Sequence, residues 1–218
     1  LPSQEASVFV SNWDTERNAS TLNYKDGSRY LLANAFMLAY GYGTPYINSG
    51  YKFEDSAAGH DAGAPGATDT SVPDTVCSTD SGWLCTQRWT AIRGMIGFHN
   101  AVSGEVTNWW SNGSTAIAFG RGTSGYLAIN NSDQDISRTF TTGMPAGEYC
   151  DVYGAGDCST TVKVGADGRL QATVPAHSAL AIHARSLKSV YQPGARSNPL
   201  DPAKDEPRQG PVDSDRTV

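Results

Sequence analysis

Apolar and polar positions follow helix-like and strand-like spacings in the first part of the chain. Residues 8–12 begin with an uninterrupted apolar run, which predicts a strand buried on both faces of a parallel sheet. Apolar residues then recur at helical spacing over residues 29–40, and Gly41 and Gly43 follow that helix. A second strand is expected at residues 45–48. Strand, helix and strand in this order predict a β/α unit with a parallel sheet.

The second part of the chain has the pattern of an antiparallel β-domain. Residues 54–82 are rich in Gly, Ala, Asp, Thr and Pro and predict a long loop, and residues 86–101 predict a second helix. Short apolar segments separated by turn residues such as Asn112-Gly113 and Asp167-Gly168 then predict a sandwich of antiparallel strands. These strands are expected at residues 106–110, 116–120, 125–129, 136–141, 147–152, 161–164, 170–174 and 179–184.

A polar cluster directly follows the first predicted strand. It contains Asn12, Trp13, Asp14, Glu16 and Arg17. Catalytic groups of parallel barrels lie at the C-terminal ends of the strands, so the Asp beside an Arg is a catalytic candidate. On local sequence alone, a helix N-cap or a surface ion pair is the more common explanation. Glu16 is interpreted as a solvated loop acid.

Two motifs resemble conserved regions of the α-amylase family of glycoside hydrolases. The usual form of the family's fourth region is Phe-Val-x-Asn-His-Asp with an Arg shortly after it, and the matching residues here are Phe9, Val10, Asn12, Asp14 and Arg17. The segment from Gly43 to Tyr51 is similar to the family's eighth-strand signature. Residues 88–185 resemble the last barrel helix and the C-terminal β-domain of secreted bacterial amylases. The resemblance covers roughly residues 5–185.

This resemblance implies the C-terminal part of a TIM (β/α)8 barrel followed by an antiparallel Greek-key β-sandwich. The expected boundaries are residues 1–102 for the end of the barrel, with strands 7 and 8 and their helices, and residues 103–185 for the sandwich. Residues 186–218 are Pro-rich and charged and are expected to be a disordered tail or linker. The chain begins without Met, and we expect a fragment whose barrel helices lack most of their sheet.

The resemblance also implies a function and the residues that perform it. It predicts part of a retaining α-1,4-glucan hydrolase acting on starch or glycogen, in which Asp14 stabilises the transition state. Asn12, Trp13 and Arg17 are the expected substrate-binding residues, and Trp13 stands where the family commonly has His. The nucleophile and general acid have no counterpart here, so the fragment alone is expected to be inactive. The alternatives are a noncatalytic carbohydrate-binding or structural β-module, or a degenerate amylase homologue.

The implied cofactors lie mainly outside this chain. Calcium is expected in the full-length parent, with its ligands upstream of this fragment. Asn12 matches a chloride ligand of some family members, but Tyr46 stands where those members have an Arg, so chloride is not expected. The four histidines, at positions 60, 99, 177 and 183, are scattered, and the sequence predicts no metal site. The full-length form is expected to be monomeric.

Charge restricts the partners. The chain of 218 residues has 16 basic and 22 acidic residues and a net charge of −6. This balance argues against nucleic acid and anionic membranes, which select clustered Lys and Arg, and it suits a neutral polymer such as an α-glucan. No apolar run approaches the length that spans a bilayer. Trp109 and Trp110 are a candidate sugar-stacking pair, although neighbouring strand residues point to opposite faces.

The cysteines indicate an oxidising compartment. Cys77, Cys85, Cys150 and Cys158 form two local pairs, each separated by eight positions, without the spacing of a zinc site. Disulfides are favoured, and the simplest of three connectivities joins each local pair; four free thiols are the alternative. With the resemblance, this predicts a secreted, extracellular protein.

Overall fold

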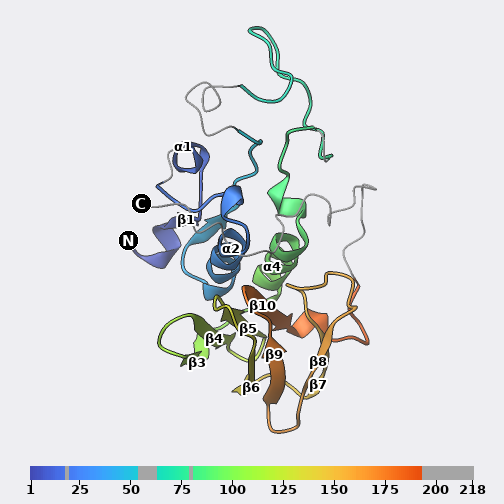
Figure 1. Cartoon of the computed structure of the whole chain (residues 1–218). Helices are drawn as coiled ribbons and strands as arrows, with labels where there is room; N and C mark the ends of the chain where they lie inside the picture. The colour runs from blue at the N-terminus through green and yellow to red at the C-terminus, as the bar shows by residue number, and fades with distance from the viewer. Residues whose placement is uncertain (18–19, 54–62, 79–80, 193–218) are drawn as a thin grey trace.

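Two helices lie side by side against one sheet of a two-sheet β-domain (Figure 1). The computed structural model describes residues 1–17, 20–53, 63–78 and 81–192. In chain order the elements are η1 (Ser3–Glu5), β1 (Ser7–Phe9), α1 (Trp13–Glu16), η2 (Tyr24–Asp26), α2 (Ser28–Tyr40), β2 (Thr44–Tyr46), η3 (Thr86–Arg88), α4 (Thr90–Ala101), β3 (Val106–Ser111), β4 (Ala116–Arg121), β5 (Gly125–Asn130), β6 (Ile136–Thr141), β7 (Gly147–Cys150), β8 (Thr161–Val164), β9 (Arg169–Val174), β10 (Ser178–His183) and η4 (Ala184–Ser186).

The expected β/α unit is present near the N-terminus. Strands β1 and β2 pair in parallel, with Val8 opposite Pro45, and helix α2 connects them. Helix α2 ends at Gly41, whose φ of 82° is left-handed, a conformation that glycine adopts without steric cost. Both strands are shorter than the sequence predicts, because only three residues of each are paired.

The expectation that the first strand is buried on both faces is wrong. Phe9 is 44% exposed and its neighbour Tyr46 on β2 is 58% exposed. Among the described strands, β1 and β2 form a sheet of their own with no further neighbour. Two parallel strands do not close a barrel, so the (β/α)8 architecture stays a prediction.

The β-domain consists of two four-stranded antiparallel sheets. Their orders are β10-β5-β4-β3 and β6-β9-β8-β7. In the second sheet, β7, β8 and β9 follow one another as hairpins and β6 lies beside β9, which is a Greek-key arrangement. All eight predicted strands are present, with their ends shifted by one or two residues at most. Apolar side chains of both sheets fill the space between them, including Tyr126, Phe140, Leu170 and Ile182.

The opposite face of the first sheet is covered by α2 and α4. Trp89, Ile92 and Phe98 belong to the same buried cluster as Phe119 and Leu127 of the sheet. The helices, expected to lack most of their barrel sheet, therefore cover a sheet of the β-domain, a contact that the sequence does not predict. Strands β5 and β10 are buried at every position, because the helices lie on one side of them and the second sheet on the other.

An arginine joins the end of α2 to the β-domain. The Arg121 guanidinium donates to the carbonyl oxygen of Ala39 at 2.7 Å and, through Nε, to that of Gly104 at 2.9 Å. A cation at this place satisfies a C-terminal carbonyl of the helix and complements the helix dipole. The two halves of the chain are thus connected by polar contacts as well as by apolar packing.

Parts of the long loop and of the predicted tail lie outside the described residues, namely 54–62, 79–80 and 193–218. The described start of the tail packs on the β-domain: Leu187 bridges to Tyr149, and the Tyr191 hydroxyl donates to the carbonyl of Gly156 at 3.3 Å. Within the described part of the chain, no helix is long and apolar enough to cross a membrane.

Both local disulfides are formed. Cys77 is bonded to Cys85 and Cys150 to Cys158, as the simplest connectivity predicts, and the described residues contain no free cysteine. The first disulfide ties the end of the long loop to η3, and the second closes the loop between β7 and β8.

Replacing Cys150 and Cys158 together by serine is expected to lower the free energy of unfolding by about 2–3 kcal/mol. The bond closes a loop with a sequence separation of 8, which restricts the unfolded chain. Urea unfolding of the double variant and the parent chain measures the difference. A loss below about 0.5 kcal/mol, the range of ordinary surface substitutions, would contradict the expectation.

Candidate functional site

The polar cluster after β1 forms a short helix whose N-terminus is capped by side-chain hydrogen bonds. In α1, the Asn12 side chain accepts a hydrogen bond from the Thr15 amide at 2.9 Å, and the Asn12 amide donates to the Thr15 hydroxyl at 3.0 Å. This reciprocal capping box satisfies two backbone donors and fixes the start of the helix. The Oδ1 atom of Asn12, a residue predicted to bind substrate, is thus engaged in the helix cap.

Asp14 is exposed in the first turn of α1. Helix α1 follows the C-terminal end of β1, and the parallel partner β2 ends at the same edge before Ile47 and Asn48. The Asp14 carboxylate is therefore accessible to a ligand in solvent, and the capping box fixes the helix that carries it. This is the position that the sequence predicts for a catalytic acid.

Arg17 joins Trp13 to a group of aromatic rings. Its guanidinium carbon lies 4.5 Å from the ring centre of Trp13, 4.6 Å from Tyr51 and 5.0 Å from Phe53. The Trp13 ring is 54% exposed and contacts Tyr51 edge-to-face at 5.6 Å. Stacking on a cation orients the indole and leaves part of it open to a ligand. The sequence predicts Trp13 and Arg17 as neighbours and places Tyr51 at the end of the eighth-strand motif, but it gives no sign that Tyr51 and Phe53 contact Arg17.

The interpretation of Glu16 as a solvated acid is wrong. Its side chain is only 2% exposed; Oε2 accepts a hydrogen bond from the side-chain Nδ2 of Asn48 at 3.1 Å, and Oε1 accepts none from the described residues. Burial raises the pKa of Glu16, and the neighbouring Arg17 cation and the Asn48 hydrogen bond partly oppose this shift. A buried carboxyl therefore connects the Asp14 helix to the segment after β2.

We expect the Glu16→Gln variant to become more stable relative to the parent chain as the pH rises, because the parent loses stability when Glu16 ionises. The stability contributed by the protonated Glu16 is complete below its ordinary pKa of 4.5 and is lost as the pH rises through the raised folded-state pKa. Glutamine stays neutral, so the difference in free energy of unfolding between variant and parent should increase from about pH 4 to pH 8. Urea unfolding at a series of pH values measures this difference.

Glu148→Gln is the matched control with the opposite sign. Hydrogen bonds from Lys188 and Thr161 lower the pKa of the exposed Glu148, so its stabilising effect is present above the ordinary pKa and lost at lower pH. This variant should lose stability relative to the parent as the pH rises. Parallel pH profiles for the two variants would contradict the assignment of Glu16.

The remaining candidates lie apart from this cluster. Trp109 is 52% exposed and stacks on Phe119 at 5.5 Å, whereas Trp110 packs on the opposite side against Phe140. A bulge in β3 at Asn108, with a φ of 50°, precedes Trp109. Within the described residues, no three His, Cys, Asp or Glu side chains gather where they could hold a metal ion.

Comparison with known proteins places the β-domain in a family. Residues 109–185 match the family model described as alpha amylase, C-terminal all-beta domain. The chain is 44% identical over 203 residues to an α-amylase of Streptomyces violaceus, covering 93% of this chain and 32% of that protein. It is 40% identical over 211 residues to the pancreatic α-amylase of Rattus norvegicus, covering 85% of this chain and 41% of that protein.

Solved structures agree with these matches. The crystal structure of α-amylase I from Eisenia fetida superposes with a TM-score of 0.77 at 34% identity, covering 84% of this chain and 42% of that chain. A variant of the same enzyme, solved in complex with maltohexaose, gives a TM-score of 0.76 at 35% identity.

These matches define a β-domain of the α-amylase class joined to a preceding helical segment. Residues 109–185 are an α-amylase C-terminal all-beta domain, and the similarity to α-amylases continues through most of the chain before it. The chain spans about a third to two fifths of the length of these curated relatives. The family predicted from the sequence is confirmed.

Proposed function

We propose that this chain is the C-terminal part of a retaining α-1,4-glucan hydrolase that acts on starch or glycogen. In this proposal β1 and β2 are the last two strands of a (β/α)8 barrel, and the Greek-key β-domain follows them. The observation that carries the proposal is the exposed Asp14, held by a capped helix at the edge where both parallel strands end. Active sites of (β/α)8 barrels lie at this edge.

Asp14 acts on the transition state rather than as the nucleophile. Its carboxylate accepts hydrogen bonds from sugar hydroxyls and stabilises the positive charge that develops on the ring. The nucleophile and the general acid come from residues outside this chain, so the 218-residue chain alone is inactive. Trp13, oriented by Arg17, offers its open face to a neighbouring glucose unit.

The complete protein is proposed to be a secreted, extracellular monomer. The two disulfides support an oxidising compartment. Calcium is proposed as a structural cofactor of the complete protein, with all its ligands outside this chain. Chloride is not proposed, because Tyr46 is uncharged where a chloride site would carry an arginine.

Hydrolysis of soluble starch by the purified complete protein tests the proposal. We expect release of reducing ends by the complete protein and none by the 218-residue chain, with the α-anomer as the first product in NMR spectra, as retention requires. A first product in the β-configuration, or hydrolysis by the short chain alone, would contradict the proposal.

The exposed Trp109 favours a second candidate, a noncatalytic carbohydrate-binding role of the β-domain. Its ring lies flat on Phe119, with an angle of 15° between the two planes, and presents an open face that a sugar ring can cover. Binding of maltohexaose by the complete protein without any hydrolysis, lost in Trp109→Ala, would favour this function over the first.

A further inference from the structure

Helix α1, which carries Asp14, is a single turn of four residues. A helix this short is not stable by itself in water, so contacts with the rest of the chain determine where α1 lies. At its C-terminal end, the side-chain Nδ2 of Asn23 donates to the carbonyl oxygen of Glu16 at 3.0 Å. The direction in which α1 presents Asp14 therefore depends on how Glu16 is held.

Glu16 and Asp14 lie two positions apart in α1. Residues with this spacing point to different sides of a helix. Asp14 is exposed, whereas Glu16 is buried and lies on the inner side of α1. A contact that fixes the inner side at Glu16 consequently fixes the direction of Asp14 on the open side.

One hydrogen bond joins Glu16 to the segment after β2. The side-chain Nδ2 of Asn48 donates to Oε2 of Glu16 at 3.1 Å, across 32 positions of the sequence. The backbone at Gly50 also approaches this carboxyl group, since a Cβ added to Gly50 would lie 3.0 Å from Oε2. Because β1 and β2 are parallel and α1 follows β1, the bond from Asn48 connects the ends of both strands at the candidate site.

Asn48 is itself held by the segment around η3. The buried Thr86 hydroxyl donates to the carbonyl oxygen of Asn48, and the Leu84 amide donates to that of Gly50 at 3.0 Å. Both donors flank a cysteine of the first disulfide, which restricts their movement. The backbone of Asn48 is thus fixed, and its side chain can hold Glu16 in one place.

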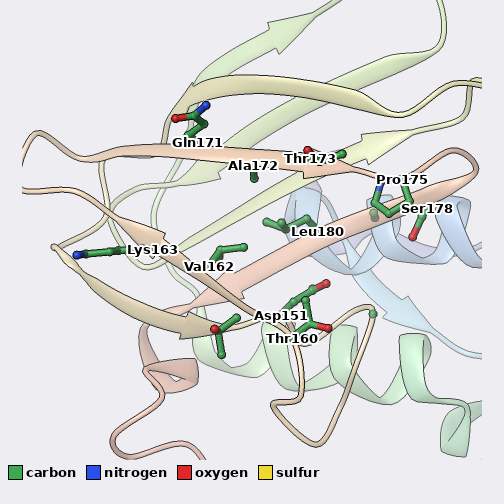
Figure 2. A pocket seen from close by; sticks show the side chains of 13 residues that line it. Asp151, Thr160, Val162, Lys163, Gln171, Ala172, Thr173, Pro175, Ser178 and Leu180 are labelled. Carbon is green, nitrogen blue, oxygen red and sulfur yellow. The ribbon is translucent and has the colours of Figure 1, made fainter.

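A buried carboxyl group of the β-domain shows a different arrangement. Asp151 lines a cavity beside Thr160 (Figure 2) and is 5% exposed. Its Oδ1 accepts hydrogen bonds from the amides of Tyr153 and Ala181, both at 3.0 Å, which join the loop after β7 to β10. The carboxyl group of Glu16 differs because its partner is a side chain at the candidate site.

We propose that Asn48 is a positioning residue for Asp14. Its side chain holds Glu16 and thereby keeps α1 in the orientation in which Asp14 lies at the edge where β1 and β2 end. In this role Asn48 acts through Glu16 rather than on the substrate. The proposal rests on the proposed role of Asp14 in glucan hydrolysis.

Kinetics of the complete protein on soluble starch test the proposal. Asn48→Ala removes the donor to Glu16 and should lower kcat at least about tenfold, because a small misplacement of a catalytic group costs this much or more. KM should change by less than about threefold, since the interaction that is lost is one with the transition state. Asn48→Leu, which keeps the approximate volume without the donor, serves if the alanine variant does not fold.

Asp151→Asn is the control, because it alters a buried acid of the β-domain. The folded variant should keep kcat within about twofold of the parent even if its stability falls. Circular dichroism verifies folding of each variant. A loss of kcat in Asp151→Asn as large as that in Asn48→Ala would show a general effect of weakened structure and would overturn the proposal.

Two combined variants separate positioning from other effects. In the Asp14→Asn background, Asn48→Ala should lower kcat by no more than about twofold, because the two residues act as one unit. Glu16→Gln combined with Asn48→Asp restores the hydrogen bond with donor and acceptor exchanged. This double variant should recover kcat to within about threefold of the parent.

Hydrogen exchange of the α1 amides reports the position of the helix without any activity. The Glu16 amide donates to the Asn12 carbonyl at 3.0 Å, and Asn48→Ala should speed its exchange in the complete protein at least about tenfold while α2 stays unchanged. Unchanged exchange at Glu16, an unchanged kcat in Asn48→Ala, or equal losses of kcat with and without Asp14 would overturn the proposal. An Asp14→Asn enzyme with the parent's kcat would instead overturn the proposed function, and the exchange result would still show whether Asn48 holds α1.

Discussion

Asp14→Asn in the complete protein is expected to lower kcat on starch by at least about a thousandfold, with folding unchanged. The proposed carboxylate carries a full negative charge to a transition state that develops positive charge on the sugar ring. Asparagine keeps the size and some hydrogen bonds of Asp14 but loses this charge. Because Asp14 is exposed and its helix is capped by Asn12 and Thr15, the substitution removes no buried contact.

Initial rates on soluble starch, with circular dichroism to verify folding, measure this effect. Asp133→Asn is the matched control, since Asp133 is an exposed acid of the β-domain that contacts His177. It should leave kcat within about twofold of the parent. An Asp14→Asn enzyme that retains more than about a tenth of the parent rate would refute the assignment.

Gly94→Ala is expected to be among the most destabilising single substitutions in the chain. Gly94 lies in α4 where the helix meets the loop after β7, and a Cβ added there would lie 1.7 Å from the carbonyl oxygen of Val152. The obstacle is backbone, so α4 must move away from the β-domain and lose apolar contacts of Ile92 and Met95. Overpacking typically costs about 1–3 kcal/mol, and a backbone obstacle at this distance places the variant at the upper end of that range or above it.

Gly97→Ala provides a control three residues later in the same helix. A Cβ at Gly97 meets nothing within 4 Å, so only the helix propensity of alanine acts, and the variant should gain up to about 1 kcal/mol. Urea unfolding of both variants against the parent chain measures the two differences. Equal stability of the two variants would show that α4 does not rest on the β-domain as described.

The local elements could be predicted from the sequence because local rules determine them. Gly41 ends α2, and Asn112-Gly113 and Asp167-Gly168 separate the predicted hairpin strands. The contact of α2 and α4 with the first sheet was not predicted, because it depends on which face of that sheet remains uncovered. Strands β5 and β10 are buried at every position, but this shows that helices cover the first sheet only when the position of the second sheet is already known.

The residues of the candidate site could be predicted where they are close in sequence, but their contacts with distant segments could not. Asn12, Trp13, Asp14 and Arg17 lie within one short segment, so a sequence motif can contain all of them. The environment of Glu16 comes from Asn48 and from packing far along the chain, and a charged residue next to Asp14 gives no local sign of burial. Two of the rings around Arg17, those of Tyr51 and Phe53, also belong to a distant segment.

The structure of the complete protein with bound maltohexaose tests the central claim most directly. The account predicts an Asp14 carboxylate oxygen within about 3.2 Å of a sugar hydroxyl beside the scissile bond, with the Trp13 ring against a neighbouring glucose unit. An ordered sugar chain in the barrel cleft with Asp14 directed into solvent would contradict it.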